Sequence, residues 1–360
     1  MKIIRYYPRA FSGDGGMTNA VRHWSEGFVR AGAAVVIAYE DGEVPDSWRS
    51  NKVECRRLRH VGPSRCKIAP DLEDAIKDAD VLVLHSAWAP HNNWAGKVAR
   101  KLGVPYVLEP RGAYDPQIVR RHRLWKKPWW WTFERELLMN ALAVHVFFPS
   151  EIQHLRSLGY GGEVIVAPNG VETPDAVHWD GGSGKYLLWM GRFDPQHKGI
   201  DVLVRAMNLI EAKRRPVLQL RGPEWRNGKT KIRRLISTLG LGAWVKVEEP
   251  IHGLEKFKLL ARSSGFVYPS RWEGFGNSVA EAVSVGVPTV VTPYPLGCYL
   301  ASRGGAILAE PTPKSLARAL ESLSSLEAPG IGARGAEIVH KEITWNLVSQ
   351  QWLSQLKALL

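Results

Sequence analysis

Residues 265–291 read GFVYPSRWEGFGNSVAEAVSVGVPTVV, and this stretch decides the fold class. The apolar run at 265–270 predicts a strand that ends at Ser270, and the closing run VPTVV predicts another strand. A glycine-containing turn and a helix-length segment separate the two runs. Because neighbouring parallel strands need a crossover of that length, the stretch predicts a parallel α/β sheet.

The same alternation of apolar runs and helix-length amphipathic segments extends over the whole chain. It begins at MKIIRYY, reaches EVIVAPNG, and starts again at KYLLWMGRFD. We therefore predict an α/β protein with two doubly wound, Rossmann-like domains. The PNG turn divides them, which gives an N-terminal domain at 1–168, a C-terminal domain at 169–344 and a final helix at 345–360.

The composition is that of a soluble globular protein, with 45% hydrophobic and 23% charged residues among 360. No apolar run is long enough to span a bilayer. The three cysteines, Cys55, Cys66 and Cys298, lack the spacing of a disulfide framework or a metal site, which indicates a reducing cytoplasmic location. The formal net charge of +13 suits anionic partners such as nucleic acid, phosphorylated ligands or acidic lipids.

A loop with two cations, GRFDPQHKG at 191–199, follows the first strand of the second half. In parallel α/β sheets, ligands bind at the carboxyl ends of the strands. Arg192 offers a planar fork of donors and Lys198 a compact positive charge, so the pair fits a diphosphate. Two surface cations in a loop are the alternative, although a glycine borders this loop on each side.

Two carboxylates, Glu273 and Glu281, bracket the glycine turn of the opening stretch. Asn277 or Ser278 is expected to cap the following helix, which places Glu281 in its first turn. The free amides of the turn and the helix dipole favour an anion there. Carboxylates also accept hydrogen bonds from hydroxyl groups, so each acid suits a polyol. For Glu281 alone, an acid that complements the helix dipole is the alternative.

Glycines also follow the first strand of the chain. Gly15 and Gly16 open a helix whose first amides suit an anion, with a plain tight turn as the alternative. Gly13, Gly15 and Thr18, together with Glu40 at the end of the second strand, come close to a dinucleotide-binding fingerprint. The threonine stands where that fingerprint needs its third glycine, which weakens this interpretation.

His85 ends the predicted strand VLVLH, and Arg111 follows the next strand, in EPRG. Side chains at these carboxyl ends can face a ligand, although a satisfied core histidine is the alternative for His85. Asp78 and Asp80 form a DxD pattern, but Asp80 precedes its strand, at the edge opposite the expected site. No other cluster has metal-ligand spacing, so no metal site is predicted.

The ordered set of these motifs resembles the retaining glycosyltransferases of family 4, which have the GT-B fold. The set comprises PSRWEGFG, the acid-x7-acid spacing from Glu273 to Glu281, the GR…KG loop, PNG, the paired glycines after the first strand and PRG after VPYV. The resemblance covers nearly the whole chain. It implies two domains facing a central cleft, with acceptor binding in the first domain, nucleotide-sugar binding in the second, and a last helix that crosses back to the first.

Carried over by position, the resemblance also implies roles for individual residues. Arg192 and Lys198 bind the donor diphosphate, and Glu281 holds the ribose hydroxyls. Glu273 faces the donor sugar without acting as a covalent nucleophile, and His85 lines the sugar pocket. Arg111 lies on the acceptor side. The other expected donor contacts are Gly15, Gly16, Gly274, Phe275, Gly276, Asn277 and Ser278.

The expected reaction transfers a hexose from a UDP- or GDP-sugar to a glycan or lipid-linked acceptor, in cell-surface polysaccharide or glycoconjugate synthesis. It needs no metal and no cofactor beyond the donor substrate. EEPIHG at 248–253 and the loop TPYPLGCYL depart from the family pattern, so the base, sugar and acceptor stay open.

The alternatives are a non-catalytic basic GT-B scaffold that binds membrane or nucleic acid, and a nicotinamide enzyme. The cations and acids of the second half favour the transferase, and no nucleic-acid partner is expected.

The segment RRHRLWKKPWWW at 120–131 combines five lysines and arginines with three adjacent tryptophans. Pro128 is expected to open a helix, on which three adjacent side chains, turned by about 100° each, cannot share one buried face. At least one tryptophan is therefore expected near the surface. Tryptophan beside cations favours peripheral docking on the anionic inner face of the cytoplasmic membrane. A helix packed in the first domain, with solvated cations, is the alternative.

Overall fold

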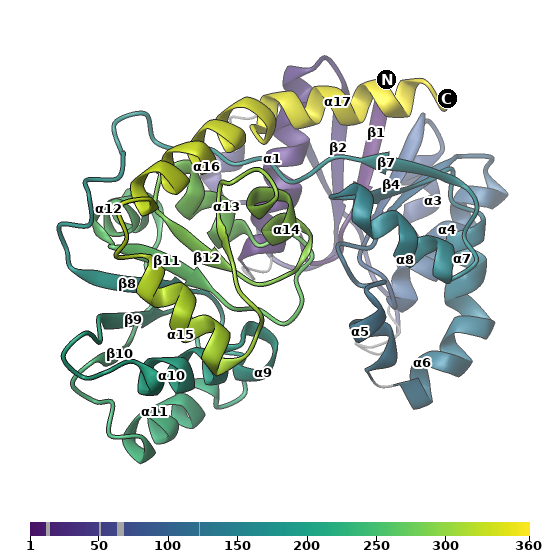
Figure 1. Ribbon diagram of the computed structural model, residues 1–360. Helices are drawn as coiled ribbons and strands as arrows, with labels where there is room; N and C mark the ends of the chain where they lie inside the picture. The colour runs from purple at the N-terminus through teal and green to yellow at the C-terminus, as the bar shows by residue number, and fades with distance from the viewer. Residues whose placement is uncertain (12–14, 50–51, 63–67, 122) are drawn as a thin grey trace. The chain divides into compact units, whose positions relative to one another are not determined.

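The computed structural model describes residues 1–11, 15–49, 52–62, 68–121 and 123–360. The chain divides into two compact units of similar size. The first unit comprises residues 1–170 together with 345–360, and the second comprises residues 171–344. Each unit is built on its own parallel sheet (Figure 1). The predicted fold class, two parallel α/β domains, is confirmed.

The first unit holds a seven-stranded parallel sheet in the order β3-β2-β1-β4-β5-β6-β7. Its strands are β1 Lys2–Tyr6, β2 Ala34–Tyr39, β3 Glu54–Arg57, β4 Val81–His85, β5 Tyr106–Glu109, β6 Ala143–Val146 and β7 Glu163–Val166. The sequence did not predict β3, whose four residues include three charged ones and present no apolar run. The strand order reverses between β1 and β4, which makes this pair the switch point of the sheet.

The second unit holds a six-stranded parallel sheet in the order β10-β9-β8-β11-β12-β13. Its strands are β8 Tyr186–Met190, β9 Val217–Arg221, β10 Val245–Glu248, β11 Gly265–Tyr268, β12 Thr289–Val291 and β13 Ile307–Leu308. The strand β11 ends at Tyr268 rather than at Ser270, because Pro269 has no amide to donate to the ladder. Here the order reverses between β8 and β11.

Helices connect the strands in both units. Those of the first unit are α1 Gly16–Arg30, α2 Asp46–Arg49, α3 Leu72–Ile76, α4 Pro90–Lys101, α5 Pro116–Arg120, α6 Arg123–Trp129, the π-helix η1 Trp130–Glu134, α7 Arg135–Met139, the 3-10 helix η2 Pro149–Glu151, α8 Ile152–Ser157 and α17 Trp345–Lys357. Those of the second are α9 Pro195–Lys198, α10 Ile200–Leu209, α11 Gly228–Thr238, α12 Gly253–Arg262, α13 Asn277–Ser284, α14 Pro295–Ala301, α15 Pro313–Ser322 and α16 Ala328–Glu342.

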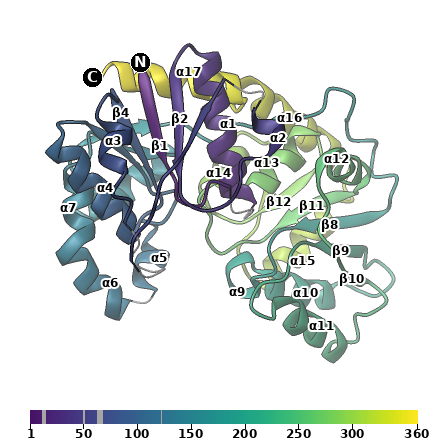
Figure 2. The ribbon, with the colours of Figure 1, turned by 180° about the vertical axis from the view of Figure 1, so that it is seen from behind.

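The first sheet is buried on both faces, which explains why its strands are continuous apolar runs. Alternate residues of one strand enter different cores: Ile3 packs with α1 and α17, whereas Ile4 packs with α3, α4 and α7. The view in Figure 2 shows α1 beside β1 and β2. Polar residues are buried in the same sheet, among them Arg5 and Glu109.

The last helix, α17, completes the first unit (Figure 1). Its Trp352 is fully buried and packs on Phe28 of α1, with ring centroids 4.6 Å apart. Its Gln355 forms two hydrogen bonds with the backbone of the edge strand β7. The side-chain amide accepts from the Val166 N–H and donates to the Val166 carbonyl, both at 3.0 Å. A helix therefore covers an edge that would otherwise be open to another chain.

Replacing Trp352 tests how far the first unit depends on α17. Trp352→Ala should lower the free energy of unfolding by about 3–5 kcal/mol, because it empties a closely packed site. The control Trp131→Ala removes a side chain that is 67% exposed, and should cost no more than about 0.5 kcal/mol. Denaturant titration followed by circular dichroism measures both variants. Equal losses would contradict the packing of α17.

Candidate active site

The cation-bearing loop follows β8, at the switch point of the second sheet. Arg192 is exposed, and its guanidinium lies 4.2 Å from the ring centroid of Trp225. Asp194 caps α9 by accepting from the His197 amide at 3.2 Å, and this short helix carries Lys198 at its last position. The loop thus holds the two predicted cations differently, one stacked on an indole and the other fixed at a helix end.

Glu273 stands after β11, the strand next to β8. Its side chain is only 9% exposed and forms an ion pair with Lys198. The same carboxylate oxygen accepts from the Ser270 hydroxyl at 2.8 Å and from the Tyr268 hydroxyl at 3.1 Å. The sequence predicted both ions at the site, but it did not predict that they pair with each other.

Electrostatics keep this acid ionised despite its burial. Burial alone would raise the pKa of Glu273, but the Lys198 ammonium and the hydrogen bond from Ser270 outweigh it and hold the pKa below its ordinary value. Burial, reinforced by the charge of Lys198, lowers the pKa of His197 to about 4. At neutral pH the cluster therefore consists of one cation, one anion and a neutral imidazole.

Two side chains that the sequence did not single out tie the loop after β8 to the turn after β11. Arg271 forms a bidentate ion pair with Asp201, both bonds measuring 2.9 Å, and its amide donates to the carbonyl of His197. His197 in turn donates to the carbonyl of Trp272 at 2.8 Å. No sequence signal marks these partners, because each is an ordinary polar residue whose role depends on the meeting of two loops.

The glycine turn differs from its predicted geometry at the start of α13. Gly276, with φ of 94°, occupies the cap position, and neither Asn277 nor Ser278 caps the helix, because both lie within it. Among the described residues no side chain caps this helix. The partial positive charge of its N-terminus suits an anion. Glu281 lies in the second turn rather than the first, where it pairs with Lys256 at 2.7 Å.

The remaining residues of this turn take different positions. Phe275 is buried, being 4% exposed, so only its backbone can meet a ligand. Gly276 lies beneath Tyr294, whose ring would be 3.5 Å from a Cβ added at the glycine. Gly274 and Ser278 are half-buried. The structure therefore places the predicted donor contacts of the second unit on one continuous turn and helix start.

In the first unit, Gly15 caps α1 with φ of 81°, and Gly16 is the first residue of the helix. Among the described residues, nothing lies within 4 Å of a Cβ added at Gly15. Gly13, the first glycine of the dinucleotide-like pattern, lies outside the described residues. Glu40, its acidic member, is buried and accepts from the Tyr6 hydroxyl at 2.5 Å.

His85 lies at the predicted carboxyl end of β4 but is fully buried. Its Nδ1 lies 2.8 Å from Oε2 of Glu109, and Arg111 donates to the same oxygen at 2.7 Å. Arg111 has φ of 52°, a left-handed conformation that is strained for an arginine. The sequence missed Glu109, although it ends β5 just as His85 ends β4, and the same positional rule would have found it.

Among the residues that the structure describes, no three His, Cys, Asp or Glu side chains gather as a metal-ligand set. In the same residues, no helix combines the length and apolar character needed to cross a membrane. Cys55 and Cys298 are free, and Cys66 lies outside the described residues.

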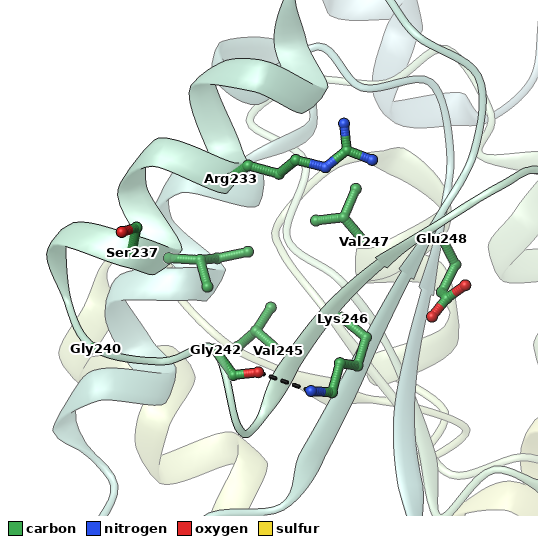
Figure 3. Close-up of a pocket in the computed structure, with 9 residues that line it drawn as sticks. Arg233, Ser237, Gly240, Gly242, Val245, Lys246, Val247 and Glu248 are labelled. Atoms are coloured by element: carbon green, nitrogen blue, oxygen red, sulfur yellow. Dashed lines mark hydrogen bonds between the residues drawn. The ribbon is translucent and has the colours of Figure 1, made fainter.

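A pocket of about 510 Å³ lies elsewhere in the second unit, between α11 and the edge strand β10 (Figure 3). Its walls include Ile236, Val245 and Val247, and at its rim Lys246 donates to the carbonyl of Gly242 at 2.7 Å. None of the predicted site residues lines it. Because the chemistry gathers at the switch point instead, this pocket is not the candidate active site.

Models of protein families match both halves of the chain. Residues 15–170 match a glycosyl transferase 4-like domain, and residues 184–325 match the glycosyl transferases of group 1. The two parallel α/β units with ligand-type residues at their strand ends are thus the domains of a glycosyltransferase.

Two curated relatives share a name, GDP-mannose:cellobiosyl-diphosphopolyprenol alpha-mannosyltransferase. The protein of Xanthomonas oryzae is 29% identical over 268 residues, and that of Xanthomonas campestris is 26% identical over 255 residues. Each match covers 69% of this chain but only 65% of the relative. The full activity of these relatives therefore does not transfer directly to this chain.

Solved structures resemble the chain along its whole length. Sucrose-phosphate synthase of Thermosynechococcus elongatus superposes with a TM-score of 0.78 at 20% identity, covering 99% of this chain and 98% of that one. HepE of Anabaena, in complex with UDP and glucose, gives a TM-score of 0.77 at 15% identity, covering 99% and 100%. The chain belongs to the GT-B glycosyltransferases of the family-4 type. This membership decides against the nicotinamide-enzyme and non-catalytic interpretations.

Gly199 provides a sharp test of the contact between the two loops of the second unit. It has φ of 65°, and a Cβ there would lie 1.9 Å from the carbonyl oxygen of Pro269. Gly199→Ala should therefore destabilise the protein by more than the roughly 1–2 kcal/mol cost of a left-handed alanine. Gly240→Ala is the matched control, since φ is 66° and nothing lies within 4 Å. Denaturant unfolding that shows equal losses would contradict the close approach of the loops.

Proposed function

We propose that the protein is a retaining hexosyltransferase that uses a nucleoside-diphosphate sugar. The observation that carries this proposal is the meeting of the Arg192–Lys198 loop with the Glu273–Glu281 turn after adjacent strands at a switch point. Cations beside a helix N-terminus suit a diphosphate, and acids suit hydroxyl groups. The names of the curated relatives, which specify GDP-mannose, and the UDP complexes of HepE support a nucleotide-sugar donor.

Arg192 and Lys198 bind the two phosphates in this proposal. An ammonium has three donors, so Lys198 can keep its bond to Glu273 and still offer bonds to phosphate oxygens. Glu281 holds the ribose hydroxyls, and Glu273 faces the sugar. The amides of 274–278 complete the donor site of the second unit. This arrangement gives each acid a hydroxyl partner and keeps both away from direct phosphate contact.

The bond between the anomeric carbon and the diphosphate breaks in the reaction, and negative charge builds on the leaving phosphate. Preorganised cations at that position are a strong source of catalysis. The acceptor oxygen attacks from the face that the phosphate leaves, and the phosphate takes the acceptor proton, so the anomeric configuration is retained. Lys198 and Arg192 neutralise the leaving group, and therefore the reaction needs neither a metal ion nor another cofactor.

The acceptor side is proposed more broadly, as a glycan or lipid-linked sugar bound by the first unit near Arg111. The relatives' names specify a diphosphopolyprenol acceptor, which supports the lipid-linked alternative. Such an acceptor places the enzyme in cell-surface polysaccharide or glycoconjugate synthesis. The base and the sugar of the donor are left to experiment.

Calorimetry and thermal shift with UDP, GDP, ADP and NAD test the donor site, since a specific ligand stabilises the folded protein by mass action. Arg192→Ala and Lys198→Ala should each weaken binding of the preferred nucleotide about tenfold or more, because each removes a charge-assisted bond. Turnover should survive EDTA. Lys246→Ala, an exposed lysine of the same unit, is the control.

Arg192→Ala is the cleaner of the two variants, because its side chain is exposed and its loss leaves no buried charge unpaired. Unchanged affinity in this variant and in Lys198→Ala would mean that the donor site is wrongly placed. Loss of turnover in EDTA, restored by Mg²⁺ or Mn²⁺, would contradict the metal-free mechanism.

We also propose that the first unit docks peripherally on an anionic membrane surface through a basic aromatic surface. Leu124, Trp125 and Trp131 on it are 89%, 48% and 67% exposed, which confirms that the adjacent tryptophans do not share one buried face. Four exposed cations surround them, at positions 120, 121, 123 and 127. Exposed indole and leucine side chains among cations fit the headgroup region of a bilayer.

Two details of this segment differ from the sequence prediction. Pro128 lies inside α6 rather than at its start, and the π-helix η1 follows, whose wider turn accommodates the missing hydrogen bond. Lys126 is buried, donates to the carbonyl of Ile118 at 2.6 Å and lies over the ring of Trp88. Four cations of this segment rather than five are therefore exposed.

Liposome sedimentation tests the docking. Neutralising positions 120, 121, 123 and 127 should abolish binding to anionic vesicles at low salt, since each cation contributes about 1 kcal/mol near such a surface. The control neutralises four other exposed cations of the same unit, Lys52, Arg59, Lys77 and Lys101. If wild type stays in the supernatant, or if both variants bind equally, the proposed surface is wrong.

A further inference from the structure

A row of three ionisable residues crosses the carboxyl edge of the first sheet. His85 of β4 and Glu109 of β5 are direct neighbours in the ladder, and His145 of β6 lies beside Glu109 in the same register. All three are buried. Burying such groups in a sheet is costly unless each is paired, so their partners decide what the row can do.

Glu109 is the centre of this cluster. Its Oε2 accepts from Arg111 at 2.7 Å and from Arg5 at 3.3 Å, and the same oxygen lies 2.8 Å from His85 Nδ1. Burial alone would raise the pKa of Glu109, but the two guanidiniums outweigh it and hold the pKa well below its ordinary value. An ionised carboxylate can only accept hydrogen bonds, and its 2.8 Å contact with Nδ1 of His85 is much shorter than the 3.5 Å between that nitrogen and Arg111. The geometry therefore favours a proton on Nδ1.

The other nitrogen of His85 is left without a proton. Arg5 and Arg111 already place two positive charges beside the ring, and burial with these charges lowers the pKa of His85 to about 3. The ring of Tyr7 meets the imidazole edge-on, with centroids 5.7 Å apart, and adds no charge. Nε2 is buried, and it has no hydrogen-bond partner among the described residues. His85 therefore holds an acceptor that the protein itself does not use.

His145 shows what a purely structural histidine looks like in the same row. Its Nδ1 lies 3.1 Å from Oε1 of Glu109, but its Nε2 lies 2.7 Å from the carbonyl oxygen of Ala167, to which it donates. The two histidines thus lie beside the two oxygens of one carboxylate and differ in the second nitrogen. Among the described residues, Nε2 of His85 has no hydrogen-bond partner, whereas Nε2 of His145 has one.

We propose that Glu109 is a positioning residue that fixes His85 in the Nδ1–H tautomer, so that Nε2 accepts a hydrogen bond from a hydroxyl group of the sugar substrate. A bare imidazole nitrogen suits a hydroxyl donor and does not suit a phosphate, which has no proton to give at neutral pH. The identity of the hydroxyl as a sugar's rests on the proposed function. The tautomer rests only on the contacts of the first unit.

Nitrogen-15 NMR of the histidine rings tests the tautomer directly in the full chain, with His85→Gln to assign the signal. In wild type, His85 should be neutral with its proton on Nδ1 throughout pH 5.5–8. In Glu109→Gln, whose amide group can face Nδ1 as a donor, the signal should shift toward the Nε2–H tautomer. Glu109→Asp should restore the wild-type tautomer in part, and the control His145→Gln should leave it unchanged.

The same variants are then assayed for release of nucleotide from UDP-glucose and GDP-mannose, with calorimetry of UDP and GDP beside it. Glu109→Gln should lower kcat about two- to tenfold, the loss of one hydrogen bond, while the Kd of UDP or GDP stays unchanged. A general folding defect would instead lower the melting temperature and weaken nucleotide binding as well.

The proposal is overturned if the wild-type spectrum shows His85 protonated on Nε2, or on both nitrogens at pH 7. This outcome does not depend on whether any variant folds. A folded Glu109→Gln protein with unchanged tautomer and unchanged kcat overturns it too. If wild type turns over neither UDP-glucose nor GDP-mannose and binds neither UDP nor GDP, the proposed function fails, and the wild-type spectrum still decides the role of Glu109.

Discussion

The ion pair between Lys198 and Glu273 is the interaction on which the candidate active site depends. It joins the loop after β8 to the turn after β11, the two connections that leave the switch point of the second sheet. A buried charge without its partner would be strongly destabilising, so each ion holds the other loop in place. Ser270, Tyr268 and the Arg271–Asp201 pair add hydrogen bonds to the same junction. The polar site is therefore also part of the structural framework of the second unit.

The first unit also contains a buried carboxylate that is kept ionised by neighbouring cations. Glu109 ends β5, one strand from the β1–β4 switch point, and is kept ionised by Arg5 and Arg111 despite full burial. In each unit, a buried carboxylate at the carboxyl edge of a parallel sheet is paired with a cation from a neighbouring connection, and in the first unit also with Arg5 of strand β1. Burial strengthens the interactions of such a carboxylate, which can therefore orient a neighbouring side chain. Glu273 orients Lys198 in one unit, and Glu109 orients His85 in the other.

Much of the fold could be predicted because strands buried on both faces appear in the sequence as apolar runs. The residues that come at the end of each run then mark the carboxyl end of a strand. Arg192, Lys198, Glu273 and His85 were found in this way. The strand β3 escaped because it is charged, and β13 because it has only two residues. The pairing of Arg5 with Glu109 was not recognised, since a pairing across strands depends on a strand order that one sequence does not reveal. Local backbone chemistry accounts for the errors at Gly276 and Pro128.

The pairing of Lys198 with Glu273 also bears on how a donor would be held. A lysine free in solvent would lose side-chain entropy on binding a phosphate, whereas this one is already ordered by the acid and lies 5.4 Å from the ring centroid of Tyr268. Its charge is partly balanced, which weakens its attraction for a phosphate in the ground state. In the proposed reaction, the growing negative charge on the leaving phosphate would attract the ammonium more strongly, while the hydrogen bond to Glu273 keeps the ammonium in position.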